Sequence, residues 1–149
     1  MNSRLATRIR QKDGLSYTVR GNFGASPLDK NGSFSAFMIY NPENVGKLEK
    51  AFQEEIERAT KDGFTAEELD AARSGWLKSR KVTRTSDTSL ASMLQSNLYV
   101  GRTMAWEKQL DDKMSALTLA ELNAAMKKYL DYSRMIAVKA GDFDKAKKP

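Results

Sequence analysis

The sequence of 149 residues contains neither histidine nor cysteine. Histidine is the commonest proton shuttle near neutral pH, and imidazole and thiolate groups are the ligands of most zinc, copper and non-haem iron sites. The chain alone therefore cannot assemble a Ser-His or Cys-His nucleophile or such a metal centre. We predict that it is not an enzyme by itself and carries no cofactor. If it serves an enzyme, it contacts substrate while the reactive centre lies elsewhere.

Proline and glycine are also scarce, with three and nine residues, whereas hydrophobic residues make up 40% of the chain. This composition is typical of a folded domain with a real core and argues against a disordered or low-complexity chain. No Pro- or Ser-rich linker and no internal repeat divides the sequence, so residues 1–149 are predicted to form a single domain or part of one. No apolar run approaches the roughly 18 residues of a membrane span.

Basic residues outnumber acidic ones, and the net charge is +6. Many of the cations fall in two clusters, Arg4, Arg8, Arg10, Lys12 and Arg20 in the first and Arg73, Lys78, Arg80, Lys81 and Arg84 in the second. Such clusters can attract nucleic acid or acidic peptides. Aromatic residues are not interleaved with them as a stacking platform requires, so we favour solvated helix surfaces and predict no nucleic-acid partner.

Hydrophobic periodicity predicts the order helix, strand, strand, four or five helices, strand. A short helix carries Leu5 and Ile9 on one side and ends at Gly14. Helical patterns account for most residues between 43 and 130. The predicted strands cover residues 17–23, 33–40 and 134–140, and Gly21 within the first of them suggests a bulge or a close backbone approach.

This order predicts an α+β fold in which helices pack on one face of a mainly antiparallel sheet. Residues 33–40 are apolar on both faces, which is typical of a strand buried on both sides. Three strands form a small sheet for so many amphipathic helices. We therefore expect that the chain is a piece of a larger domain or that its unfinished sheet pairs with another copy to form a homo-oligomer.

Several short strings of this sequence occur in a recognisable order. Asn2–Leu5 followed by Ile9–Tyr17 (IRQKDGLSY) resembles the SRL…LREK-x-GL-x-Y segment of pitrilysin/insulinase-type zinc metallopeptidases. The downstream strings PENV, GFTAEEL and TLAEL, and the closing Gly-Asp at 141–142, resemble the same family in the same order. The resemblance is to the second, inactive domain of these proteases. It implies a partial insulinase-like domain that extends N-terminally of Met1, of which residues 1–149 form the C-terminal portion.

The resemblance also implies a role for two residues. In this family an Arg and a Tyr, seven positions apart, reach from the inactive domain into a closed chamber and hold the peptide substrate. Arg10 and Tyr17 occupy the matching positions. The family's inverted H-x-x-E-H zinc motif has no counterpart in a chain without histidine, so zinc and that motif are expected in a catalytic partner domain or subunit. The family occurs in bacterial cytoplasm and periplasm, and the sequence does not choose between them.

The residues leave two other interpretations open. Relatives of this fold serve as structural or processing-peptidase-like subunits without a substrate role, and the sequence does not separate them from substrate-binding domains. A small basic nucleic-acid-binding domain is the other alternative and rests only on the two charge clusters. By themselves, Arg10 and Tyr17 could equally be a surface charge and a strand residue with a hydrated hydroxyl.

Overall fold

The computed structural model describes residues 1–144 and divides the chain into two compact units. The first unit comprises residues 1–63 and the described residues from 126 onwards, and the second comprises residues 64–125. The first contains α1 (Asn2–Leu5), η1 (Ala6–Lys12), β1 (Thr18–Ala25), β2 (Gly32–Ile39), η2 (Pro42–Asn44), α2 (Val45–Asp62) and η3 (Tyr132–Arg134). The second contains α3 (Ala66–Thr83), α4 (Asp87–Tyr99) and α5 (Met104–Ala116), and α6 (Leu119–Tyr129) begins in it and ends in the first unit.

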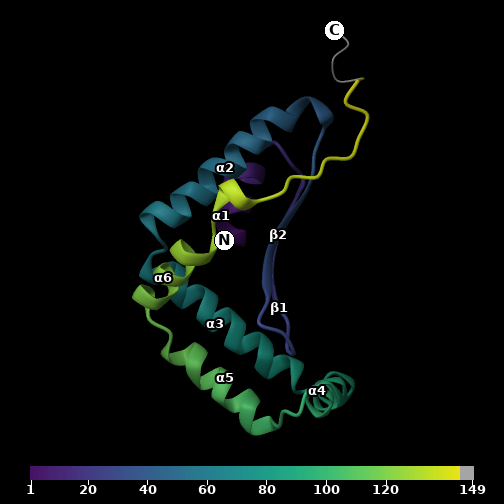
Figure 1. The fold of residues 1–149 in the computed structure, drawn as a ribbon, viewed down its shortest axis with the longest axis vertical. Helices are drawn as coiled ribbons and strands as arrows, with labels where there is room; N and C mark the ends of the chain where they lie inside the picture. Colours follow the sequence, from purple (N-terminus) through teal and green to yellow (C-terminus); the bar gives the residue numbers. More distant parts are fainter. Residues whose placement is uncertain (145–149) are drawn as a thin grey trace. The chain divides into compact units, whose positions relative to one another are not determined.

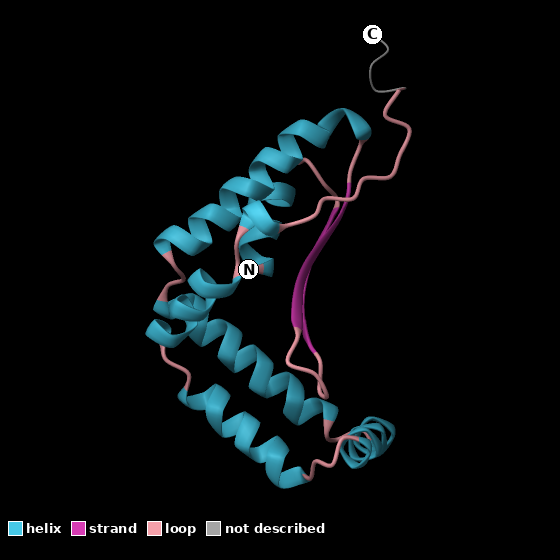
Figure 2. Cartoon of the chain, viewed as in Figure 1, coloured by secondary structure: helices cyan, strands magenta, loops and turns pink. Residues whose placement is uncertain are grey.

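The sheet of the first unit is an antiparallel hairpin of β1 and β2 (Figure 2). Its register runs from Thr18 opposite Ile39 to Ala25 opposite Gly32, without a break. The turn between the strands is a polar segment that contains Pro27, Asp29 and Asn31, residues that favour turns. Within it, Ser26 Oγ accepts hydrogen bonds from the backbone N–H groups of Leu28 and Asp29, at 3.2 and 3.0 Å. This side-chain contact is the usual reason why serine favours turns.

The core of the first unit lies on one face of this hairpin. The N-terminal helix, α1 and η1, lies between α2 and the strands (Figure 1). Its two apolar side chains, Leu5 and Ile9, are fully buried against Leu48 and Ala51 of α2. Half-buried residues from the rest of the unit close this core: Met1, Leu15, Val19, Met38, Tyr40 and Phe52. The predicted α+β class, with helices on one face of an antiparallel sheet, is confirmed.

The predicted burial of residues 33–40 on both faces is wrong. The inward residues of β2, which alternate from Phe34 to Met38, are half-buried. On the opposite face Phe37 and Ile39 are 59% and 57% exposed. Side chains alternate between the two faces of a strand, and helices cover only one face of this sheet. The apolar outer face of β2 therefore remains open to solvent.

The predicted strand at residues 134–140 is also wrong. Arg134 ends the short helix η3, and residues 135–140 are irregular. Ile136 and Val138 are 91% and 89% exposed. A strand needs a hydrogen-bonded neighbour, and among residues 1–144 only β1 and β2 pair with each other. The segment is instead tied to α2 by an ion pair between Lys139 and Glu49, at 2.6 Å.

Two helices that begin in the second unit, α3 and α6, start at capping boxes. At the start of α3, Thr65 Oγ1 accepts a hydrogen bond from the Glu68 N–H, and the Glu68 carboxylate accepts one from the Thr65 N–H. Thr118 and Glu121 make the same reciprocal pair at the start of α6. Each box satisfies two backbone donors that the first helical turn leaves without partners. Both boxes have the Thr-x-x-Glu spacing that is typical of a helix N-terminus.

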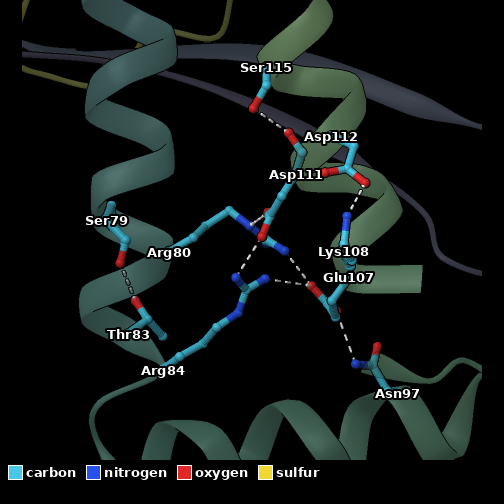
Figure 3. A network of polar contacts seen from close by, with 10 residues as sticks. All are labelled: Ser79, Arg80, Thr83, Arg84, Asn97, Glu107, Lys108, Asp111, Asp112 and Ser115. Carbon is cyan, nitrogen blue, oxygen red and sulfur yellow. Dashed lines mark hydrogen bonds and ion pairs between the residues drawn. The ribbon is translucent and has the colours of Figure 1, made fainter. Parts of the chain in front are cut away.

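A polar network joins α3, α4 and α5 (Figure 3). The Arg80 guanidinium forms ion pairs with Glu107 and Asp111, and its Cζ atom lies 4.5 Å from the centroid of the Trp76 ring. Arg84 Nη1 donates to Asp111 at 2.5 Å. Asn97 Nδ2 donates to Glu107 at 3.0 Å, and Glu107 is buried. Two members of the second basic cluster are thus paired within the protein.

The same contacts shift the pKa values of both carboxyl groups downward. Burial raises the pKa of Glu107, but hydrogen bonds from Arg80 and Asn97 and the two arginine charges outweigh it, and the net pKa is lowered. The pKa of Asp111 is lowered chiefly by its hydrogen bond from Arg84, with a further contribution from Arg80. Folding therefore favours the ionised form of each group.

We expect Arg80→Ala to destabilise the second unit by about 3 kcal/mol, because it leaves the buried Glu107 carboxylate without its main partner. The matched control is Lys108→Ala, which removes the solvent-exposed α5 ion pair to Asp112 and should cost well under 1 kcal/mol. Urea unfolding, followed by the fluorescence of Trp76 and Trp106, measures the loss of unfolding free energy in each variant. Equal losses for the two variants would contradict this assignment.

The pKa shifts also predict acid sensitivity. A carboxyl group whose folded pKa is lowered stabilises the protein above its unfolded pKa, about 4, and that stability is lost as the pH falls through the folded pKa. The urea concentration at the unfolding midpoint of the second unit should therefore decrease as the pH is lowered from about 5 to about 2. The double variant Glu107→Gln, Asp111→Asn should show a smaller fall over the same range. An identical pH dependence in the variant would show that these two carboxyl groups are not responsible.

Candidate functional site

Arg10 lies on η1, a turn of π-helix that continues α1. The wider turn is visible in its hydrogen bonds, since the Asp13 N–H donates to Arg8 O at 3.0 Å and the Leu15 N–H to Ile9 O at 2.8 Å. Gly14 then reverses the chain with a φ of +61°, a left-handed conformation that glycine adopts without strain. Such π-turns occur frequently at functional sites. Here the turn holds Ile9 in the core and leaves Arg10 exposed.

Tyr17 stands directly before β1 and is 81% exposed. The residue before it, Ser16, is buried, and its Oγ atom lies 2.7 Å from the Thr18 carbonyl oxygen and 2.6 Å from that of Ile39. The single hydroxyl proton can serve either carbonyl. Ser16 therefore fixes the open end of the hairpin and, with it, the backbone that carries Tyr17.

The structure brings the two predicted site residues together. The Cζ atom of Arg10 lies 5.2 Å from the centroid of the Tyr17 ring, within the range of a cation–π contact. Among residues 1–144, Arg10 makes no hydrogen bond or ion pair with another side chain. The N–H donors of Arg10 and the hydroxyl of Tyr17 are thus free for a ligand. Both residues are exposed at the surface.

Two residues that position this pair were not found by sequence reasoning. Arg8 donates to Asp13 at 2.6 Å and to Glu54 of α2 at 2.8 Å, so it fastens η1 to α2. Ser16 was missed as well. The Arg8–Asp13 spacing is not one that faces across an α-helix, because neighbours there are three or four positions apart. Only the π-turn makes the contact, and the sequence carries no signal for it.

Neither a metal centre nor a membrane helix is found in the described part of the chain. Residues 1–144 contain no group of three or more Asp, Glu, His or Cys side chains that could hold a metal ion. No helix in this part of the chain combines the length and apolar character that a membrane crossing requires. The site residues present therefore do not fit a zinc ion.

A cavity of about 630 Å³ lies elsewhere in the first unit. Ile56 of α2 and Leu130 contribute its apolar part, and Lys61, Lys127 and Arg134 are among its polar lining residues. The cations at the ends of α2 and α6 have a structural explanation, since basic side chains stabilise helix C-termini. Neither Arg10 nor Tyr17 lines this cavity.

Comparison with known proteins identifies the family. Residues 1–75, half of the chain, match the family described as the peptidase M16 inactive domain. This chain belongs to that family, as its string-by-string resemblance to pitrilysin/insulinase-type proteases predicts. The matched half includes both Arg10 and Tyr17. No curated protein sequence matches the chain.

Two solved structures share the fold. One is a peptidase M16 inactive domain from Pseudomonas fluorescens, with 24% identity and a TM-score of 0.74 over 86% of this chain and 30% of that one. The other is the periplasmic protease PqqL from Escherichia coli, with 22% identity and a TM-score of 0.71 over 87% of this chain and 14% of that one. The chain thus spans less than a third of either protein.

Proposed function

We propose that this chain holds peptide substrate as the non-catalytic domain of an M16-type zinc metallopeptidase, and that Arg10 and Tyr17 contact the peptide backbone. The observation that carries the proposal is the cation–π contact that leaves both polar groups exposed and without side-chain partners. Membership of the inactive-domain family supports a non-catalytic role for this chain beside a separate catalytic domain. The H-x-x-E-H motif belongs to another domain or subunit.

Tyr17 supplies a hydrogen-bond donor to the substrate. Peptide hydrolysis builds negative charge on the scissile carbonyl oxygen, and a donor aimed at that oxygen stabilises the transition state more than the ground state. Removal of one such donor costs about 2.7–4 kcal/mol where it has been measured. The Tyr17 phenol is exposed and its backbone is fixed by Ser16, so the hydroxyl can meet a peptide without reorganisation of the hairpin.

Arg10 contributes in two ways. Its planar guanidinium presents N–H donors that fit peptide carbonyl groups, and its positive charge favours negative charge developing nearby. Its contact with the Tyr17 ring also restrains that ring. Arg8 is held by two carboxylates and is unavailable for the same task. Within the first basic cluster, Arg8 thus attaches η1 to α2, and Arg10 is the arginine available to a ligand.

The metal in this proposal comes from the catalytic partner. A zinc ion held there would activate the attacking water. The described residues, 1–144, do not fit a zinc ion, so the steps assigned to this chain are binding and orienting the peptide and stabilising charge on its carbonyl oxygen.

In the complete protease, Tyr17→Phe should lower kcat about 100-fold or more with little change in KM, because the lost hydrogen bond forms fully only in the transition state. Tyr129→Phe is the matched control, since Tyr129 is another exposed tyrosine in the same unit and should leave kcat unchanged. Arg10→Ala should lower kcat/KM strongly, whereas Arg20→Ala, at an exposed position of β1, should not. A Tyr17→Phe enzyme with normal kcat would remove Tyr17 from catalysis.

The isolated chain should bind no stoichiometric zinc and should cleave no peptide. Zinc titration by calorimetry and a fluorogenic peptide assay at neutral pH measure the two. Zinc-dependent hydrolysis by the purified chain would contradict the proposal, whatever the effect of the Tyr17 variant.

A further inference from the structure

Arg8 and Arg10 lie two positions apart on η1 but have different partners. Arg8 binds the carboxylates of Asp13 and Glu54, at 2.6 and 2.8 Å, whereas the guanidinium of Arg10 lies over the Tyr17 ring. Asp13 is the acidic residue nearest to both arginines in the sequence. The arginine that Asp13 binds is therefore the one that becomes less available to a ligand.

The hydrogen-bond spacing of η1 determines which arginine this is. In an α-helix, side chains three or four positions apart are neighbours. Asp13 lies three positions after Arg10 and five after Arg8, so an α-helical turn would place its carboxylate beside Arg10. An α-helical turn would also place Arg8 beside Lys12, and two like charges at this spacing are unfavourable. The π-turn, with hydrogen bonds between residues five apart, brings Arg8 and Asp13 together instead.

The backbone hydrogen bond of Leu15 reports which turn is present. In this structure the Leu15 N–H donates to Ile9 O at 2.8 Å. At the glycine-capped end of an α-helix, the residue after the glycine donates to the carbonyl five positions earlier. Since Gly14 is the glycine here, an α-helical turn would give the Leu15 N–H the carbonyl of Arg10 as its acceptor. The acceptor of this one amide thus distinguishes the two turns.

The π-turn lies between two fixed points. Ile9 is fully buried in the core, and Ser16 is buried with its Oγ atom 2.6 Å from Ile39 O. A change from the π-turn to an α-helical turn would shift the end of the helix by one residue, a rotation of roughly 100° around its axis. The residues between the two fixed points, which include Arg10, would have to absorb that rotation. The contact between Arg10 and the Tyr17 ring therefore depends on the π-turn.

We propose that Asp13 is a positioning residue for Arg10 and Tyr17. Its ion pair with Arg8 holds the π-turn, and the π-turn keeps the Asp13 carboxylate away from Arg10 and the Arg10 guanidinium over the tyrosine ring. Charge preferences at helical spacings are small, so the ion pair selects between two turns whose ends are already fixed. The expected effect on hydrolysis rests on the proposed function, whereas the expected effect on the turn does not.

Four variants of the chain test the turn itself. Asp13→Ala removes the ion pair but leaves Arg8 attached to Glu54 of α2, whereas Asp13→Glu retains a carboxylate at the same position. Lys12→Glu offers Arg8 an acidic partner four positions away, the spacing of an α-helix, and Lys12→Gln is its uncharged control. Lys12 is exposed, so its replacement leaves the packing of the first unit unchanged.

NMR spectroscopy measures the outcome. Couplings across hydrogen bonds identify the acceptor of the Leu15 amide, and nuclear Overhauser contacts report whether the Arg10 side chain lies on the Tyr17 ring. We expect the wild-type acceptor and ring contact in both control variants, Asp13→Glu and Lys12→Gln. Asp13→Ala should change the acceptor to the Arg10 carbonyl and lose the ring contact, and Lys12→Glu should do so in part of the molecules. A π-turn that Asp13→Ala leaves unchanged would overturn the proposal.

In the complete protease, Asp13→Ala should lower kcat/KM about tenfold or more, because a misplaced guanidinium no longer meets the peptide. Asp13→Glu should restore most of this loss, since the carboxylate that binds Arg8 is still present. If Asp13→Ala lost the contact between Arg10 and Tyr17 but kept its kcat/KM, the proposed function would fail and the assignment of Asp13 would stand. A lowered kcat/KM with an unchanged turn would overturn the assignment of Asp13 alone.

Discussion

The burial of Leu5 and Ile9 between α2 and the hairpin is the constraint on which the candidate site depends. These two side chains fix the N-terminal helix in place, and Arg8 adds ion pairs to Asp13 and to α2. Because Ile9 points into the core, its neighbour Arg10 must emerge on the surface. The glycine turn at position 14 then returns the chain so that Tyr17 reaches the guanidinium. The apolar packing of Leu5 and Ile9 thereby holds the Arg10 guanidinium and the Tyr17 phenol together, although neither group is part of that packing.

The parts that could be predicted from the sequence were those with a local cause. The capping boxes at Thr65 and Thr118, the serine-anchored turn after β1 and the glycine stop after α2 each rest on residues a few positions apart. The inward stripe of α2 follows from helical periodicity alone. The placement of Arg10 beside Tyr17 was expected from family resemblance, and the structure supplies the distance.

The predictions that were wrong depend on neighbouring residues that are far away in the sequence or absent from this chain. Residues 134–140 have the alternation of a strand, but a strand exists only where another strand accepts its hydrogen bonds. The apolar outer face of β2 suggested burial, yet nothing in residues 1–144 covers it. The Arg8–Asp13 contact needs a π-turn that no propensity scale foresees. In the first two cases the missing information was the partner, and in the third it was the backbone conformation.

The two units have different physical characters. The first has an apolar core and carries an exposed arginine–tyrosine pair on its surface. In the second, α3, α4 and α5 are joined by a charged network whose members mostly satisfy one another. Its basic residues are thus largely accounted for by contacts inside the unit, which is a structural explanation for a cluster that could otherwise be taken for a nucleic-acid surface.

The most direct measurement of the central claim is a crystal structure of the complete protease with an uncleaved peptide bound. The account predicts a hydrogen bond of about 2.5–3.0 Å from Tyr17 Oη to a peptide carbonyl oxygen, with the Arg10 guanidinium on the same stretch of backbone. A peptide bound for cleavage with both side chains beyond hydrogen-bonding reach would contradict it.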